Sequence, residues 1–179
     1  MTHQTFFIET LNSPTGGVRI ITDADDRLRA VDFDDYEPRM HKLLHRHYGE
    51  GEVTLTARPA PSPAYRALEA YFDGDLHAID ALPSETAGTD FQREVWAALR
   101  TIPVGKTLSY GELAQRIGRP AAVRAVGLAN GANPVGIVVP CHRVIGANGA
   151  LTGYGGGIAR KRWLLRHEGA FSEGGFALE

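Results

Sequence analysis

The sequence predicts an α+β fold made of two parts. Residues 1–88 are expected to form a small antiparallel β-sheet with flanking helices, and residues 89–179 a mainly helical domain. Runs typical of strands lie early in the chain, and capped amphipathic helices follow residue 88. The charge also reverses: residues 1–90 contain 8 Lys/Arg and 16 Asp/Glu, whereas residues 91–179 contain 11 and 5, so the net charge changes from −8 to +6. The turn-rich stretch Pro83–Gly88 marks the predicted boundary.

Composition limits the class of protein. With 179 residues, 43% of them hydrophobic and 22% charged, the chain is typical of a globular protein. A single cysteine excludes an internal disulfide. The N-terminus lacks a signal-peptide pattern, and no apolar run approaches the roughly 20 residues that cross a bilayer, so we expect a cytoplasmic protein without a membrane partner. The basic second half favours a polyanionic partner, with a solvated basic face as the alternative.

The first part begins with three short runs rich in β-branched and aromatic residues, which predict strands. They are Thr5–Thr10, Val18–Thr22 and Leu28–Phe33. The short polar connection Asp23–Asp26 joins the second run to the third, so a meander is expected. A helix is predicted over Glu37–Tyr48, where Gly49 stops it. A second helix begins at Ser62-Pro63, with serine as the N-cap, and closes at Gly74.

Two histidines of the first helix, His41 and His45, lie four residues apart on one face. This spacing could hold a metal ion, but no cysteine or further histidine cluster is nearby to complete a site. A solvated helix face is the simpler interpretation. We therefore expect no metal and no cofactor.

Boundary signals predict three helices at the start of the second part. Thr89–Gln92 has the spacing of a capping box, and the apolar pattern that follows ends near Thr101. Ser109–Glu112 repeats the capping box ahead of a second helix. The tight turn Gly118–Pro120 then leads to a third helix over Ala121–Asn130.

Two helices joined by a short glycine-containing turn have the outline of a helix-turn-helix, which predicts a DNA-binding domain. The second helix is slim, because small residues such as Ala125 dominate it and Arg124 is its only long side chain. A slim helix can approach a groove closely, and one arginine can then reach inside it. Tight helix packing is the alternative. We favour DNA because Lys106, Arg116, Arg119 and Arg124 gather here.

The segment after these helices ends in a glycine-rich loop and a last helix. Asn148-Gly149 is a strong tight-turn signal, and Gly153–Gly157 contains four glycines around Tyr154. The loop lacks the Lys-Ser/Thr of a phosphate-binding loop, so close approach of backbone N–H groups to a flat ligand suits it better. Arg160–His167 is predicted to be helical.

The only cysteine, Cys141, follows a buried apolar run and Pro140, and three interpretations compete for it. A zinc site of the deaminase type needs a second cysteine three positions on, where the chain has Val144. A cysteine hydrolase needs His142 at the sulfur, but neighbouring residues of an extended segment point to opposite sides, so a turn or a bridging water would be required. An inert buried cysteine would leave His142 and Arg143 in apolar surroundings, where both need partners.

The wider pattern resembles the O6-alkylguanine-DNA alkyltransferases, most closely the bacterial Ogt-type members. Pro-Cys-His-Arg-Val-Ile-Gly at 140–146 is preceded by Gly-Ala-Asn-Pro at 131–134 and followed by Thr-Gly-Tyr-Gly-Gly-Gly at 152–157. The resemblance extends from Thr89 to Gly169 almost without a gap. The first 88 residues resemble that family's ribonuclease-H-like domain in outline only.

The resemblance implies direct, irreversible transfer of an alkyl group from O6 of guanine to Cys141, so that each molecule acts once. It assigns His142 to deprotonate the thiol through a water, and Glu168 to orient His142. Asn133 would tie the cysteine loop to the DNA-binding helices. The guanine pocket would be formed by Val144, Tyr154, Gly155 and Gly156.

The implied partner is double-stranded DNA with O6-alkylguanine, bound through the minor groove, with O4-alkylthymine as a further candidate lesion. Arg124 would fill the space left by the flipped base, and Tyr110 would help to rotate the phosphate. Ser109, Arg119 and Ala125 would belong to the same DNA-binding face. We expect a monomer in solution and leave cooperative assembly on DNA open. The alternative is a DNA-binding or lesion-flagging protein of the same fold that transfers nothing.

Overall fold

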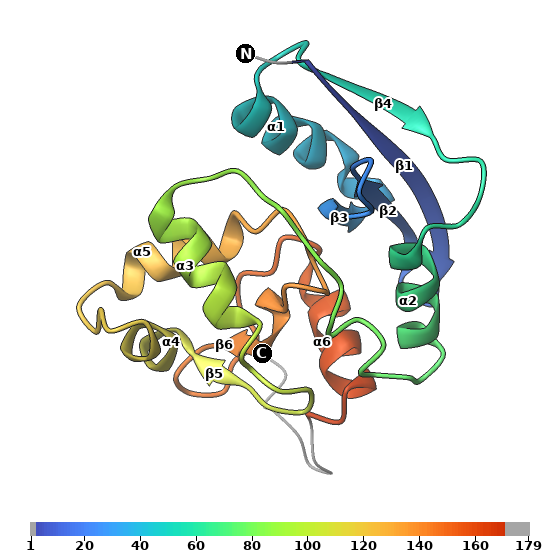
Figure 1. The fold of residues 1–179 in the computed structure, drawn as a ribbon. Coiled ribbons are helices and arrows are strands. Elements are labelled where there is room, and N and C mark those ends of the chain that lie inside the picture. The colour runs from blue at the N-terminus through green and yellow to red at the C-terminus, as the bar shows by residue number, and fades with distance from the viewer. Residues whose placement is uncertain (1–2, 171–179) are drawn as a thin grey trace. The chain divides into compact units, whose positions relative to one another are not determined.

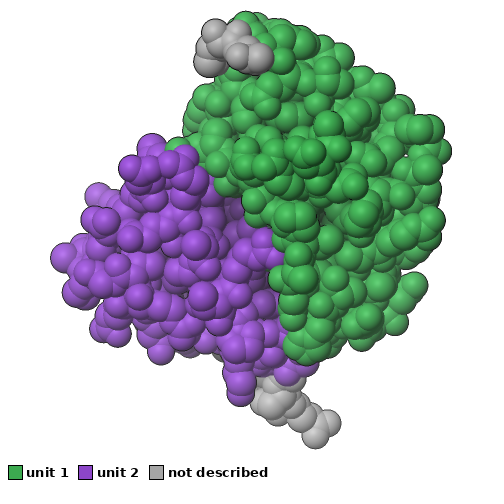
Figure 2. All heavy atoms as spheres, viewed as in Figure 1, with its two compact units in different colours: residues 1–88, 134–138 green, residues 89–133, 139–179 purple. Residues whose placement is uncertain are grey.

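The computed structural model describes residues 3–170, which fall into two compact units (Figure 2). The first unit is Met1–Gly88 together with Pro134–Val138, and the second is Thr89–Asn133 together with Val139–Glu179. The short segment Pro134–Val138 belongs to the first unit because it pairs with the third strand. The Val31 N–H donates to the Pro134 carbonyl at 3.0 Å, and the Gly136 N–H donates to the Val31 carbonyl at 3.0 Å.

The first unit is built on a four-stranded sheet of order β3-β2-β1-β4. Its strands are β1 (Gln4–Ser13), β2 (Gly16–Thr22), β3 (Leu28–Phe33) and β4 (Val53–Ala57). The first three form the predicted antiparallel meander. A fourth strand that was not predicted, β4, adds to the edge of this sheet parallel to β1. This strand has only five residues and little burial, so its sequence carries a weak strand signal.

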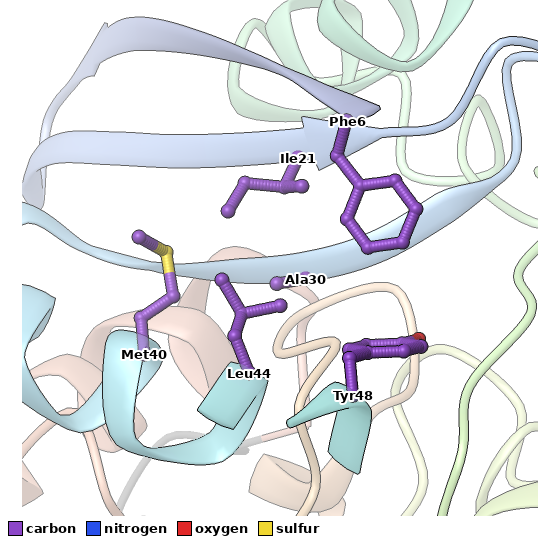
Figure 3. Close-up of a cluster of buried hydrophobic side chains, with 6 residues drawn as sticks. All are labelled: Phe6, Ile21, Ala30, Met40, Leu44 and Tyr48. Atoms are coloured by element: carbon purple, nitrogen blue, oxygen red, sulfur yellow. The ribbon is translucent and has the colours of Figure 1, made fainter. Parts of the chain in front are cut away.

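The core of the first unit lies between the sheet and α1 (Glu37–Tyr48), whose bounds match the prediction. Figure 3 shows the α1 side chains Met40, Leu44 and Tyr48 pointing toward the strands. There they meet Phe6 of β1, Ile21 of β2 and Ala30 of β3. Helix α2 (Pro63–Phe72) starts at the predicted cap, since the Ser62 hydroxyl accepts from the Tyr65 N–H at 3.1 Å, and it packs against β1 and β2. A short 3₁₀ turn, η1 (Asp34–Tyr36), leads into α1.

The second unit is mainly helical, as predicted. Its helices are α3 (Asp90–Leu99), α4 (Tyr110–Arg116), α5 (Val123–Gly131) and α6 (Ile158–His167), with a 3₁₀ turn η2 (Cys141–Arg143). Figure 1 shows α3, α4 and α5 grouped together, and each packs against the other two. A two-residue parallel pair, β5 (Leu108–Ser109) with β6 (Val144–Ile145), was not predicted.

Both predicted capping boxes are confirmed, and they explain why α3 and α4 begin where they do. The Thr89 hydroxyl accepts from the Gln92 N–H at 3.1 Å, and the Gln92 side chain accepts from the Thr89 N–H at 3.0 Å. In the same way, the Ser109 hydroxyl accepts from the Glu112 N–H at 3.0 Å, and the Glu112 carboxylate accepts from the Ser109 N–H at 2.7 Å. Across the described part of the chain, no helix is long and apolar enough to cross a membrane.

Candidate active site around Cys141

The backbone presents Cys141 on a tight turn. The Cys141 N–H donates to the Val139 carbonyl at 2.8 Å, and Pro140 between them has φ −83° and ψ 66°, the geometry of an inverse γ-turn. The same carbonyl also accepts from the Asn133 side-chain amide at 2.8 Å. Asn133 is buried just beyond the C-terminal end of α5, so it ties the turn that carries the cysteine to that helix.

The chain is unusual just upstream, where Ile137 has a φ of 70°. A β-branched residue rarely adopts this left-handed conformation, because its side chain crowds the backbone. The Val138 N–H closes a γ-turn onto the Gly136 carbonyl at 2.8 Å, and the Ile137 side chain is 1% exposed. Burial of this side chain and the tight hydrogen bond hold a strained backbone four residues before the cysteine.

The His142 imidazole is buried beside the cysteine and bonded on one side to a carboxylate. Its Nε2 lies 2.9 Å from Oε2 of Glu168, and both side chains are 0% exposed. A proton on Nε2 donates to the carboxylate, which leaves the lone pair of a neutral ring on Nδ1. Nδ1 is buried, and no described residue forms a hydrogen bond with it. His142 is therefore arranged to accept a proton at Nδ1 while Glu168 holds its ring.

The turn also removes the geometric objection to a Cys–His pair. An extended segment would send the two side chains to opposite sides, whereas Cys141–Arg143 forms the 3₁₀ turn η2. The turn after Pro140 that was considered from the sequence is therefore present. Neighbouring residues of such a turn can share one side of the backbone.

Glu168 is held by Arg143 as well as by His142. The Arg143 guanidinium donates from Nε to Oε1 at 2.8 Å and from Nη2 to Oε2 at 3.0 Å, and a third N–H donates to the Ile102 carbonyl at 2.6 Å. Burial alone would raise the pKa of Glu168, but His142 and Arg143 outweigh it and hold that pKa well below its usual range. Glu168 is therefore an anion at neutral pH.

Sequence reasoning gave Arg143 no role beyond the need for a partner, and it missed Asn130. Asn130 is a buried side chain of α5, and its amide nitrogen lies 3.5 Å from the Cys141 carbonyl. Its side-chain oxygen is buried and accepts from no described residue. A polar residue in the buried stripe of α5 was the available signal for this second link between the helix and the cysteine turn.

The predicted guanine-pocket residues lie beside this cluster. Val144 follows η2 and is buried, and the Tyr154 ring approaches the His142 ring edge-on, with centroids 6.5 Å apart. Gly155 is partly exposed and Gly156 buried. The Gly156 carbonyl accepts from Arg160 at 3.2 Å, which fixes the glycine loop to the start of α6.

Tyr110 connects the glycine loop to α5. Its hydroxyl donates to the Thr152 carbonyl at 3.4 Å. A Cβ added to Gly127 would lie 3.8 Å from its ring, and a Cβ added to Gly153 would lie 3.5 Å from its hydroxyl. Gly153 also has a φ of 59°, which favours glycine. Tyr110 thus lies at the start of α4, between α5 and the glycine loop.

Helix α5 has one exposed face, which carries a single arginine. Arg124 and Ala125 are exposed, and Val123 and Leu128 add apolar groups to the same helix. Its buried residues pack on α3, where the Trp96 indole N–H donates to the Ala129 carbonyl at 2.9 Å. Arg124 forms no ion pair or hydrogen bond with any residue between 3 and 170. The predicted pair of helices joined by a short turn is present as α4 and α5, which pack against each other.

The other two residues expected on the DNA-binding face have partners of their own. Arg119 donates to the exposed Glu94 at 3.0 Å, and its guanidinium lies over the Phe91 ring at 5.5 Å. The Ser109 hydroxyl accepts from the Glu112 N–H as the cap of α4.

His41, considered above as a metal ligand, lies 3.2 Å from Glu37. No group of three or more His, Cys, Asp or Glu within residues 3–170 is arranged to hold a metal ion.

Comparisons with known proteins match both parts of the chain. Residues 90–170 match the family model of the 6-O-methylguanine DNA methyltransferase DNA binding domain, and residues 7–86 match that of its ribonuclease-like domain. A methylated-DNA–protein-cysteine methyltransferase of Shigella flexneri is 53% identical over 161 residues, which cover 90% of this chain and 94% of the relative. A methylated-DNA–protein-cysteine methyltransferase of Mycobacterium tuberculosis H37Rv is 56% identical over 128 residues, which cover 71% of this chain and 77% of the relative.

Solved structures agree with these matches. The crystal structure of Mycobacterium tuberculosis OGT in complex with DNA has a TM-score of 0.72 and 42% identity, and covers 93% of each chain. The O6-methylguanine methyltransferase of the same organism has a TM-score of 0.71 and 44% identity, and covers 95% of this chain and 94% of its own. These relatives share both the fold and close to half of the residues with the present chain.

Proposed function

The chain belongs to the 6-O-methylguanine DNA methyltransferase family, and we propose on this basis that Cys141 accepts the alkyl group of O6-alkylguanine in DNA. One observation carries the assignment: Cys141 is the only cysteine among 179 residues, so alkyl transfer to a protein cysteine has a single acceptor here. Its surroundings suit a nucleophile, because His142 and Glu168 form a hydrogen-bonded pair beside it.

The proposed step is a displacement at the alkyl carbon. The Cys141 sulfur forms a bond to that carbon, and the bond from the carbon to O6 breaks, with its electron pair remaining on the guanine. The thiol proton passes through a water to Nδ1 of His142, and the departing guanine takes up a proton to return to its keto form. The thioether that results is stable, so no thiol is regenerated and each molecule acts once.

His142 and Glu168 serve the deprotonation. A free thiol has a pKa of about 8.5 and supplies little thiolate at neutral pH, so a base is needed. The Glu168 carboxylate accepts from Nε2 and orients the ring, which leaves Nδ1 as the basic atom. Asn133 supports the reaction indirectly, because it holds the turn that carries the sulfur.

DNA binding is assigned to α4 and α5, in agreement with the DNA-binding domain matched over residues 90–170. A base stacked inside a duplex cannot reach a buried sulfur, so the damaged nucleotide has to be flipped out of the helix. The outward face of α5 is slim enough to enter a minor groove, and Arg124 is its one charged side chain, free to occupy the vacated space. We expect Tyr110 to contact the flipped nucleotide, with the protein acting as a monomer.

The direct test is the intact mass of the protein after incubation with a duplex that contains one O6-methylguanine. We expect one added methyl group per molecule, located in the peptide that contains Cys141, and no further turnover when the substrate is in excess. DNA bound at the same concentrations without any change of mass would contradict the proposal and favour a lesion-flagging protein.

Arg124→Ala should slow repair of duplex DNA by about tenfold or more and leave reaction with free O6-benzylguanine within about twofold of the unmodified protein. The free base needs no extrusion, so it does not need the arginine. Rates of Cys141 alkylation by the two substrates measure this directly. Equal losses on both substrates would show that Arg124 acts on the reacting cysteine and not on base extrusion.

A further inference from the structure

The large hydrophobic side chains that are exposed between residues 3 and 170 gather on one helix. There are two of them in this range, Val123 at 39% and Leu128 at 72% exposure, and both belong to α5. Elsewhere in the same range the large apolar side chains are buried or half-buried. A single exposed leucine is ordinary, but this one lies on the helix that carries Arg124, so its position points to a contact surface.

Leu128 lies one helical turn beyond Arg124 on the same face of α5. Residues four apart on a helix are neighbours on its surface, and a helical side chain leans over the turn that precedes its own Cα. The Leu128 side chain is therefore directed along the helix surface toward the stem of Arg124. The exposed Ala125 adds only a methyl group, so Leu128 provides most of the apolar bulk on this face.

The fold of the second unit does not need this leucine. Alanine favours helix formation at least as strongly as leucine, and it already occupies the exposed position 125. The buried side of α5 is formed by Val126, Ala129 and Asn130. An apolar side chain that is 72% exposed gains free energy only when a partner covers it and removes it from water.

Duplex DNA is the partner that fits this surface. Proteins that bind the minor groove combine cationic side chains with apolar wedges, leucine among them, that enter between base steps. Arg124 and Leu128 provide this combination on one face of α5, inside the matched DNA-binding domain. A specific protein interface buries roughly 800 Å² on each partner, far more than the two exposed apolar side chains of α5 supply.

We propose that Leu128 is a second groove-inserting residue, which packs beside Arg124 against the duplex and helps to hold the damaged nucleotide outside the stack. The inference rests on the proposed function, because transfer to Cys141 requires extrusion of the lesion. Arg124 occupies the vacated space, whereas Leu128 excludes water from the arginine stem and from the neighbouring bases. Return of the nucleotide to the stack then has to displace both side chains.

Two substitutions of Leu128 isolate its apolar bulk. Leu128→Ala removes the bulk, and Leu128→Met is the matched control, because methionine keeps an apolar side chain of similar volume. Both variants should fold, since the site is exposed and alanine, leucine and methionine have similar helix propensities. Equal midpoints of urea unfolding check this. Single-turnover transfer is then compared for a duplex with O6-methylguanine, for the same strand unpaired, and for free O6-benzylguanine.

Leu128→Ala should lower the second-order rate constant for the duplex by about tenfold, through weaker binding of the extruded state. Its rate with free O6-benzylguanine should stay within about twofold of the unmodified protein, because the free base needs no extrusion. The unpaired strand should show a smaller loss than the duplex, and Leu128→Met should keep all three rates. The salt dependence of duplex binding should not change, since leucine neutralises no phosphate and releases no counterion.

A duplex rate for Leu128→Ala equal to that of the unmodified protein would overturn the proposal. An equal loss with free O6-benzylguanine would also overturn it, because the effect would then lie at Cys141 and not in the groove. A protein that is dimeric without DNA in sedimentation experiments, and that Leu128→Ala dissociates without changing the duplex rate, would assign the leucine to self-association instead.

Failure of the proposed function would look different. In that case the unmodified protein would gain no mass from any of the three substrates. Fluorescence anisotropy of the lesion-containing duplex would still test Leu128, because about tenfold weaker binding by Leu128→Ala, with binding kept by Leu128→Met, would support the groove contact. Equal binding by all three proteins would contradict it.

Discussion

Cys141→Ser should abolish alkyl transfer and leave binding to lesion-containing duplex DNA within about twofold of the unmodified protein. A serine hydroxyl is far less acidic than a thiol, so the His142–Glu168 pair cannot supply a useful concentration of the anion. The turn should survive, because it depends on the backbone N–H of residue 141 and on Asn133. Intact mass after incubation with O6-methylguanine DNA measures transfer, and fluorescence anisotropy of the same DNA measures binding.

The same experiment separates the competing functions. An added methyl group on Cys141→Ser would place the acceptor elsewhere and contradict the assignment. Binding without transfer by the unmodified protein would support lesion flagging. Repeated turnover of activated esters that depends on Cys141 would instead support a hydrolase.

Glu168→Gln should destabilise the protein by about 3–5 kcal/mol and slow transfer by about a hundredfold or more, with DNA affinity preserved. The neutral amide leaves the buried Arg143 guanidinium without its counter-ion. It can also present an N–H to Nε2 of His142, which would put the ring proton on Nδ1 and remove the base. Urea unfolding and single-turnover rates at saturating DNA measure the two effects. Glu69→Gln is the control, because Glu69 is an exposed carboxylate of α2.

The pH dependence of stability gives a second test of the Glu168 site. Because the pKa of Glu168 is lower in the folded than in the unfolded protein, its contribution is fully present above about pH 4.3 and is lost as the pH falls toward the folded pKa. Glu168→Gln should therefore lose this part of the acid sensitivity of folding. An unchanged difference in unfolding free energy between pH 7 and pH 3 would show that the carboxylate is not stabilised as its contacts indicate.

Elements with local boundary signals were predicted well. Helix α1 was predicted over its full length, and the Thr89 and Ser109 caps identified the starts of α3 and α4, because capping is decided within four residues of chain. Strand β4 and the β5–β6 pair were missed. A strand of two to five residues has no stable conformation of its own and exists only through hydrogen bonds to a distant partner.

The functional site shows the same difference between residues that the sequence predicted and residues that it missed. Cys141 and His142 were singled out by the sequence as a candidate pair with an open geometric objection, and the family resemblance implied their roles and that of Glu168. Arg143 was seen only as a polar group in need of a partner, and Asn130 was missed. Sequence spacing cannot show that Arg143 reaches Glu168, 25 residues further along the chain, or that the Asn130 amide lies beside the Cys141 carbonyl.

The sequence by itself determined the fold class, the helix-turn-helix, the single acceptor cysteine and the family. These depend on local patterns: periodicity, caps, composition and a contiguous motif. Only the tertiary structure decided which nitrogen of His142 is free and what holds Glu168 as an anion. Electrostatic roles depend on distance and burial, and the folded chain sets both by bringing distant residues out of water together.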